Sequence, residues 1–210
     1  MGRHKGYDRQ TVLDKAMELF WKKGFEGTHL QELVGVTGLN RFSLYKEFGG
    51  KEGLFEEAVN KYLASLQSLG AYLMREPLGL NNILEYLRQV IRTDFSYGCF
   101  MVNTLTQKHV VQKQITERVR NFAQGSEQAL RKNFQAAQEK GEISADLDVN
   151  ALAKFMLVFD MGLVTYELLS PAMKEKEEIW EILKSLLQSP DKSFPSDLAV
   201  RSRPAAMGRR

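Results

Sequence analysis

The chain has 210 residues, of which 43% are hydrophobic and 26% charged, and this composition excludes collagen-like and disordered proteins because it supplies enough apolar side chains for a core. One cysteine excludes an intramolecular disulfide and a cysteine-rich zinc site, and with no apolar stretch after Met1 we expect a cytoplasmic protein without a signal peptide. Residues 1–51 hold nine Lys or Arg against six Asp or Glu, whereas residues 52–190 hold fifteen against eighteen, so the first segment either faces a polyanion or reflects a chance imbalance.

Helical periodicity begins near the N-terminus, and no part of the chain alternates polar and apolar residues as a half-buried strand does. Apolar residues at positions 13, 16, 17 and 20 predict a first helix that Asp8 caps and Gly24 ends. The pattern Thr28-x-x-Gln31 matches a capping box and predicts a second, short helix that stops before Gly38.

A third short helix and a long fourth helix follow. Asn40 can cap the third helix, which we expect to run through Tyr45 and to break at Gly49 and Gly50. Lys51 opens a longer amphipathic helix, with apolar residues at positions 54, 55, 58, 59, 62, 63 and 66.

In the rest of the chain, apolar periodicity and capping residues predict helices over about residues 80–97, 102–108, 112–140, 149–169 and 171–188. We expect a mobile tail after the last helix. The longest apolar segment, residues 151–169, contains Lys154, Asp160 and Glu167 and is therefore not expected to span a membrane. Because a buried charge is costly unless it is paired, we expect Asp160 to contact either a ligand or an Arg or Lys on a neighbouring helix.

Two short capped helices joined by a turn with a glycine form a helix-turn-helix, here over residues 28–48. In such a unit the second helix lies in the DNA major groove with its N-terminal residues at the base edges. Leu44 must face inward, with Phe48 as a further anchor, and Arg and Phe are side chains that can contact guanine and the thymine methyl group. A solvated helical hairpin is the alternative. The residues left on the outer face are Asn40, Arg41, Phe42, Ser43, Tyr45 and Lys46.

The segments Gly-Phe-Glu-Gly-Thr28 and Thr-Gly-Leu-Asn-Arg-Phe-Ser-Leu-Tyr-Lys-Glu-Phe-Gly-Gly-Lys-Glu-Gly-Leu-Phe55 resemble the DNA-binding signature of the tetracycline-repressor (TetR) family. The resemblance is strong over residues 8–63 and continues more weakly through residues 98–103 and 141–148. It implies an all-α homodimer with an N-terminal three-helix DNA-binding domain and a C-terminal helical bundle that dimerises and holds an inducer pocket. We expect these domains over residues 1–50 and 51–189, with a flexible tail over residues 190–210.

The resemblance also implies roles for single residues. Thr28 would cap the second helix and touch a phosphate, residues 40–43 would read bases, and Tyr45 and Lys51 would hold the DNA backbone; we also place Gln31 and Lys46 in this interface. Gly35 departs from the family, which usually has a stronger helix former such as Ala there, and it should weaken the short helix by about 0.5–1 kcal/mol.

The penultimate helix predicts dimerisation independently of the family resemblance. It is apolar nearly all round and must therefore be covered on both sides. One side can face its own domain and the other a second subunit, unless the helix is simply the buried centre of a monomer. Its two faces comprise residues 152, 155, 156, 159, 163 and 166, and residues 153, 157, 161, 164 and 168; the last helix adds residues 179, 180, 183, 186 and 187.

A cavity for a small molecule is predicted where aromatic, Met and Cys side chains fall on inward faces, although the same pattern is typical of plain core. We expect an uncharged or weakly charged apolar ligand. Cys99 is either a redox sensor or a small buried hydrophobe. The candidate ligand-binding residues are Phe95, Cys99, Phe122, Phe155, Met156, Phe159 and Tyr166.

The sequence contains no phosphate-binding loop, no nucleophile elbow and no set of His and Cys residues spaced for a metal, so we expect neither an enzyme nor a cofactor. The function that fits best is a sequence-specific transcriptional regulator, a repressor that a small apolar ligand releases from its palindromic operator. The alternative is a helical protein of the same fold that binds lipids or other small molecules and has no DNA function.

Overall fold

The computed structural model describes residues 7–169 and 173–188, and every regular element in that part of the chain is a helix. The α-helical fold class predicted from the sequence is confirmed. The helices are α1 (Arg9–Lys23), α2 (Leu30–Thr37), α3 (Arg41–Phe48), α4 (Lys51–Gly70), the 3-10 turn η1 (Ala71–Met74), α5 (Leu80–Arg92), α6 (Phe100–Thr106), α7 (Lys113–Glu139), α8 (Val149–Tyr166) and α9 (Met173–Leu187).

Local sequence signals set the ends of several helices where they were predicted. The Asp8 carboxylate accepts the Thr11 N–H at 2.8 Å and caps α1, whose C-terminal residue precedes Gly24 at φ 75°. The Asp148 carboxylate caps α8 in the same way, accepting the Asn150 N–H at 2.8 Å. The predicted tail after Pro190 lies outside the described residues.

The capping box predicted at the start of α2 is wrong by one residue. Helix α2 begins at Leu30, so His29 is the cap, and the Glu32 carboxylate accepts the His29 N–H at 3.0 Å. The Thr28 side chain is fully buried, and its hydroxyl donates to the Gly24 carbonyl at 2.7 Å. The prediction relied on the Thr28-x-x-Gln31 pattern, whereas the carboxylate of Glu32, one residue further along, is the acceptor at this helix N-terminus.

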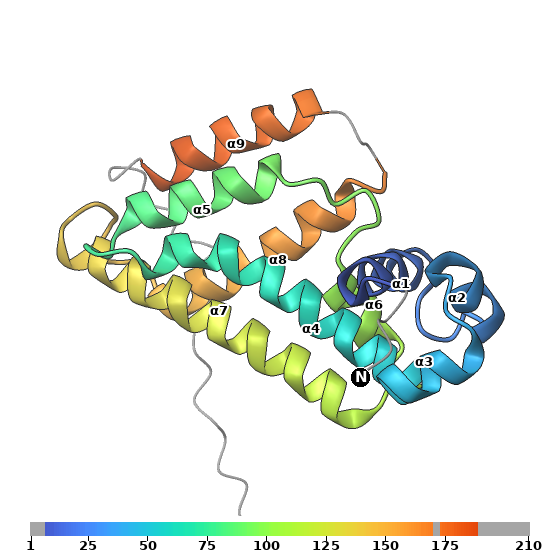
Figure 1. The fold of residues 1–210 in the computed structure, drawn as a ribbon. Coiled ribbons are helices and arrows are strands. Elements are labelled where there is room, and N and C mark those ends of the chain that lie inside the picture. The colour runs from blue at the N-terminus through green and yellow to red at the C-terminus, as the bar shows by residue number, and fades with distance from the viewer. Residues whose placement is uncertain (1–6, 170–172, 189–210) are drawn as a thin grey trace, which may run out of the picture.

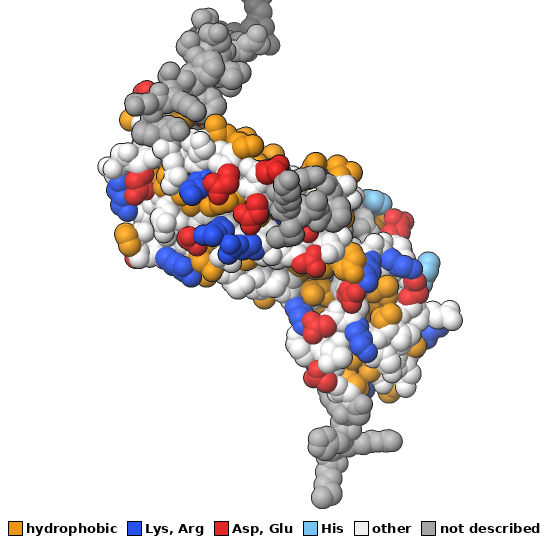
Figure 2. Space-filling view, turned by 90° about the horizontal axis from the view of Figure 1, so that it is seen from above, with side chains coloured by type: hydrophobic (Ala, Val, Ile, Leu, Met, Phe, Trp, Pro, Cys, Tyr) orange, Lys and Arg blue, Asp and Glu red, His pale blue; other side chains and the backbone are white. Residues whose placement is uncertain are grey.

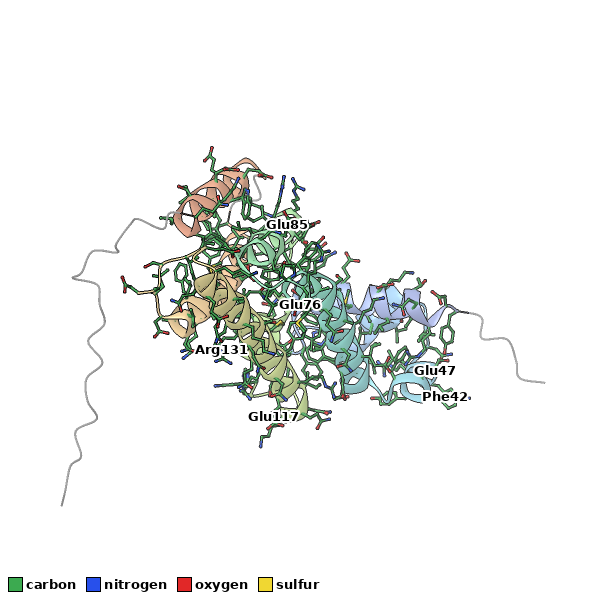
Figure 3. The ribbon with its side chains drawn as sticks, turned by 90° about the vertical axis from the view of Figure 1, so that its left-hand side faces the viewer. Phe42, Glu47, Glu76, Glu85, Glu117 and Arg131 are labelled. Carbon is green, nitrogen blue, oxygen red and sulfur yellow. The ribbon has the colours of Figure 1, made fainter. Side chains whose placement is uncertain are left out.

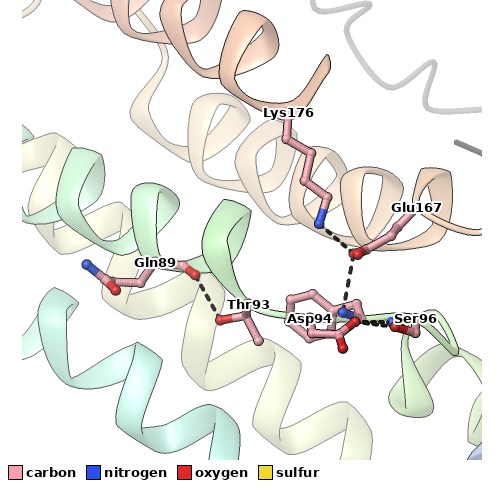
Figure 4. Close-up of polar contacts among 7 residues, drawn as sticks. Gln89, Thr93, Asp94, Ser96, Glu167 and Lys176 are labelled. Carbon is pink, nitrogen blue, oxygen red and sulfur yellow. Dashed lines mark hydrogen bonds and ion pairs between the residues drawn. The ribbon is translucent and has the colours of Figure 1, made fainter. Parts of the chain in front are cut away.

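Helix α5 ends at Arg92, five residues earlier than predicted, because the next segment makes contacts of its own. The Thr93 hydroxyl donates to the Gln89 carbonyl at 2.8 Å, and the Phe95 N–H points to Glu167 at the end of α8, at 3.3 Å. Figure 4 shows these contacts together with Lys176 of α9, whose ammonium lies 2.8 Å from the Glu167 carboxylate. Both side chains of this ion pair are less than 10% exposed, so the pair fixes the 93–98 loop to α8 and α9.

The helices form two packed groups that α4 connects (Figure 1). Helices α1, α2 and α3 lie at one end around the first turns of α4, and α5, α7, α8 and α9 form the larger body at the other end. Edge-to-face contacts of Phe55 with Phe20 at 5.0 Å and with Phe100 at 5.7 Å join the two groups through one continuous core. The N-terminal helices are therefore held to the body by packed aromatic rings.

A close approach of backbones sets the angle between α3 and α4. A Cβ atom added to Gly53 would lie 1.7 Å from the Phe48 carbonyl oxygen, so only glycine fits at this point. Gly35 in α2 has no such requirement, because a Cβ atom there would meet no other atom within 4 Å. The sequence pattern could not distinguish these two helical glycines, since the difference lies in the neighbouring turn.

Among the described helices, α8 is the one long and apolar enough to cross a membrane by length and composition. It packs along α7, and its Asp160 side chain is buried inside the protein. The apolar side chains of α8 therefore lie partly in the core of the chain and partly on the outer face described below.

Candidate nucleic-acid interface and ligand cavity

Helix α3 has one buried face and one exposed face. Leu44 is fully buried and Phe48 is 6% exposed, as predicted, so both anchor the helix to the core. Phe42 and Tyr45 are 75% and 57% exposed, which is unusual for aromatic side chains. Figure 3 shows Phe42 at the end of the molecule opposite α9. The predicted residues on this outer face are all exposed or half-buried: Asn40, Arg41, Phe42, Ser43, Tyr45 and Lys46.

Asn40 has a structural task in addition to its place on this surface. Its Oδ1 accepts the Ser43 N–H at 2.8 Å and so caps α3. That bond orients the first turn, where Arg41 and Phe42 project outward. The first turn of α3 is thus held rigid by a side chain of the interface itself.

Thr28, Gln31 and Lys51 were assigned to the same interface, but their environments in the structure differ. The Thr28 side chain is buried and bonded to Gly24, so the phosphate contact implied for its hydroxyl is wrong. Gln31 is exposed on α2. The Lys51 ammonium lies 4.4 Å from the centre of the Phe25 ring, and partial burial lowers the pKa of Lys51. Lys51 is positioned next to α3, and its contact with DNA stays a prediction.

A cavity of about 500 Å³ lies inside the larger body. Helices α4, α5, α7 and α8, the η1 turn, the segment that leads into α6 and the first turn of α6 surround it. Its walls are mostly aliphatic and aromatic, and its volume is in the range typical of small-molecule sites. Three of the seven predicted ligand-binding residues, Phe95, Cys99 and Phe122, line this cavity.

The other four predicted ligand-binding residues do not line the cavity. Phe155 and Tyr166 are 56% and 45% exposed on the outside of α8, Met156 is buried elsewhere in the core, and Phe159 is half-buried and packed against Phe155. Instead α8 contributes Leu157, Asp160, Met161 and Val164 to the cavity. Periodicity shows that α8 has two apolar faces, but it cannot show which of them points inward.

Among the described residues, no Arg or Lys pairs with Asp160, which was one of the two expectations for it. The Tyr86 hydroxyl donates to its Oδ2, and its Oδ1 has no hydrogen-bond partner among the described residues. Burial raises the pKa of Asp160 to about 7, against a smaller opposite effect of the Tyr86 hydrogen bond. Sequence reasoning missed Tyr86 because its position in α5 gives no sign of a partner 74 residues away.

Two elements connect the cavity to the N-terminal helices. Tyr62 of α4 and Cys99, the residue before α6, both line the cavity. Next to Cys99, the Gly98 carbonyl accepts the Trp21 indole N–H from α1 at 2.9 Å. Gln107 at the end of α6 accepts the Glu26 N–H at 3.0 Å. A change in the cavity can therefore reach α1 through α6 as well as through α4.

An apolar surface remains on α8 and α9. Figure 2, which looks down on α9, shows hydrophobic side chains gathered along the upper edge of the larger body. Trp180 and Leu183 of the predicted α9 stripe are instead buried within their own chain. The exposed large apolar side chains of this surface, called the outer apolar face below, are Phe155, Val158, Tyr166, Leu168, Leu169, Ile182 and Leu186.

The comparisons with known proteins cover both groups of helices. Residues 12–58 match the family of bacterial regulatory proteins called the tetR family, and residues 79–181 match the tetracyclin repressor-like C-terminal domain. The HTH-type transcriptional repressor ComR of Escherichia coli (strain K12) is 33% identical over 168 residues, covering 77% of this chain and 80% of ComR.

Two further similarities extend along most of the chain. The uncharacterized HTH-type transcriptional regulator YezE of Bacillus subtilis (strain 168) is 28% identical over 165 residues, covering 74% of this chain and 84% of YezE. The TetR family regulator CifR, solved with 26bp double-strand operator DNA, is 26% identical and superposes with a TM-score of 0.72 over 90% of this chain and 99% of CifR.

Proposed function

This chain belongs to the tetR family of bacterial regulatory proteins, and on that basis we propose that it is a cytoplasmic transcriptional repressor that binds a palindromic DNA operator as a homodimer. The exposed face of α3 carries this proposal. Arg41, Phe42 and Tyr45 project from a helix whose opposite face is buried, so they are free to contact a partner. Similarity to ComR and to operator-bound CifR supports the same function.

In this proposal α3 enters the major groove. Arg41 and Phe42 in its first turn are placed to read base edges, whereas Tyr45, Lys46 and Lys51 lie further along and suit phosphate oxygens. A dimer presents two such helices, so we expect half-sites whose centres lie about one helical turn, or a small multiple of it, apart. Residues 1–50 act as the DNA-binding domain and residues 51–189 as the ligand-binding and dimerisation domain.

We place the dimer interface on the outer apolar face of α8 and α9. Its side chains are more than 40% exposed in the single chain, and large apolar surfaces are rarely left uncovered in a monomer. A two-fold interface would bring each helix against its own copy or against the other helix of the partner. This is the arrangement expected of a four-helix interface.

Release from DNA follows from the connection between the cavity and α1. A ligand in the cavity shifts the protein toward a DNA-incompetent state only if it binds that state more tightly. Because α4 and α6 both line the cavity and contact α1, a ligand that moves either helix changes the separation of the two α3 helices. A rigid duplex cannot follow that change.

Arg41→Ala is expected to weaken binding to the preferred operator by about 1–3 kcal/mol and to relax the preference at one base pair of each half-site. The physical reason is the loss of paired hydrogen bonds to a base edge. Operator affinity measured by fluorescence anisotropy on a set of single-base variants checks both effects.

Lys51→Ala is the matched control for a backbone contact. We expect it to weaken binding to all sequences alike. It should also reduce the slope of log affinity against log salt by the amount that corresponds to about one lost phosphate contact per subunit. If Arg41→Ala lowered affinity for every base variant equally, the assignment of Arg41 to base reading would be wrong.

A further inference from the structure

The described residues that line the cavity include an acidic side chain and no basic one. Among the described residues that line it, Asp160 is an acid, and none is Lys, Arg or His. The remaining polar groups are neutral, and they belong to Tyr62, Gln67, Tyr86 and Ser126. An acidic ligand would therefore find no cation here, and it would be repelled by an ionised Asp160.

The Asp160 carboxylate also has unused capacity to accept a hydrogen bond. The side chain is 7% exposed and stands in the cavity wall. Its Oδ2 is occupied by the Tyr86 hydroxyl, whereas no described residue donates to the buried Oδ1. Buried polar atoms are nearly always hydrogen-bonded, so an unpaired carboxylate oxygen on a side chain that lines a cavity calls for a donor from outside the chain.

The surroundings of Asp160 favour a cation as that donor. A carboxylate that receives a cationic donor gains a charge-assisted hydrogen bond, which is stronger than a neutral one, and burial strengthens it further. Phe95, Phe122 and Tyr62 bring aromatic rings to the same cavity, and such rings attract cations through their faces. The rest of the wall is apolar and suits a hydrocarbon body.

We propose that the ligand of this cavity is a lipophilic amine whose protonated amino group donates a hydrogen bond to Oδ1 of Asp160 while its apolar body fills the space between α4, α5, α7 and α8. This inference rests on the proposed function, because it names the chemistry of the molecule that would control DNA binding. It revises the expectation of an uncharged or weakly charged ligand. The raised pKa of Asp160 is consistent with it, since a bound cation lowers that pKa and stabilises the carboxylate.

Three probes with one skeleton test the proposal: 4-phenylbutylamine, 4-phenylbutanol and 4-phenylbutyrate. Their binding is measured near neutral pH by displacement of Nile red, a neutral apolar dye. The amine is expected to displace the dye at a concentration at least about tenfold lower than the alcohol, with the carboxylate weakest. In Asp160→Asn the advantage of the amine over the alcohol should fall at least about tenfold, with each inhibition constant corrected for the affinity of that variant for Nile red.

Tyr86→Phe is the second variant, because it removes the hydroxyl and keeps the carboxylate. We expect it to retain or increase the preference for the amine, whereas a site that recognised the ligand through the tyrosine hydroxyl would lose it. Equal binding of the three probes, or a preference for the carboxylate, would overturn the amine proposal and leave the regulator proposal intact. Failure of Nile red itself to bind would contradict a ligand-holding cavity, and DNA binding is tested separately.

Discussion

Val158→Glu and Ile182→Glu are each expected to convert the proposed dimer to a monomer and to weaken operator binding by at least about 100-fold, the factor that two linked binding sites typically provide over one. Val158 is 68% exposed on α8 and Ile182 is 61% exposed on α9, so neither substitution disturbs the core of the single chain. Placing a carboxylate in an apolar interface buries an unpaired charge on both sides of the two-fold axis.

Sedimentation velocity at micromolar protein concentration and operator titration measure the two effects. Gln124→Glu is the control, because it adds the same charge to an exposed position of α7, away from the outer apolar face. Leu183 and Leu157 would be poor choices for this test, since Leu183 is buried within the chain and Leu157 lines the cavity. If both variants stayed dimeric, the interface would lie elsewhere.

Asp160→Asn is expected to stabilise the protein at pH 8 and to have a smaller effect at pH 5. Burial raises the folded-state pKa of this acid from 3.8 to about 7, so the folded protein binds more protons than the unfolded chain between these values. Stability therefore falls as the pH rises through this window, and the loss is complete above about pH 7. Asparagine cannot ionise and avoids that loss.

The difference in the free energy of unfolding between Asp160→Asn and the wild type should grow by about 3 kcal/mol from pH 5 to pH 8. The growth occurs over the two pH units between pH 5 and the folded-state pKa of about 7, and each unit corresponds to about 1.4 kcal/mol. Urea unfolding at a series of pH values measures it. Asp146→Asn serves as the control, since it makes the same substitution at an exposed position. A difference for Asp160→Asn that does not change with pH would show that Asp160 is solvated in the folded state.

The helix-turn-helix could be predicted from the sequence because its signals are local. Asp8, Asn40 and the glycines at 24, 38 and 49 end or begin helices through contacts within a few residues. The inward face of α3 followed from Leu44, whose neighbours in the helix are polar or exposed. At the start of α2, the Thr28-x-x-Gln31 pattern predicted the wrong cap, because the helix begins one residue later and His29 takes that position.

The cavity could be predicted only in part, because its walls come from segments far apart in the chain. Phe95, Cys99 and Phe122 were found from their residue types, whereas Phe155 and Tyr166 have the same types and lie outside. Nothing in the sequence near Asp160 indicates that the Tyr86 hydroxyl is its partner, or that no other described residue donates to it. Likewise, the early end of α5 depends on the Glu167 carboxylate, 72 residues from Phe95.

If the exposed face of α3 reads a DNA sequence, selection of bound duplexes from a random pool by the purified full-length protein should enrich one palindrome at moderate salt. We expect half-site centres about one helical turn or a small multiple of it apart, and an enriched set that changes at one base pair per half-site for Arg41→Ala. A wild-type protein that enriches no motif under these conditions would contradict the claim and favour a helical small-molecule-binding protein without a DNA function.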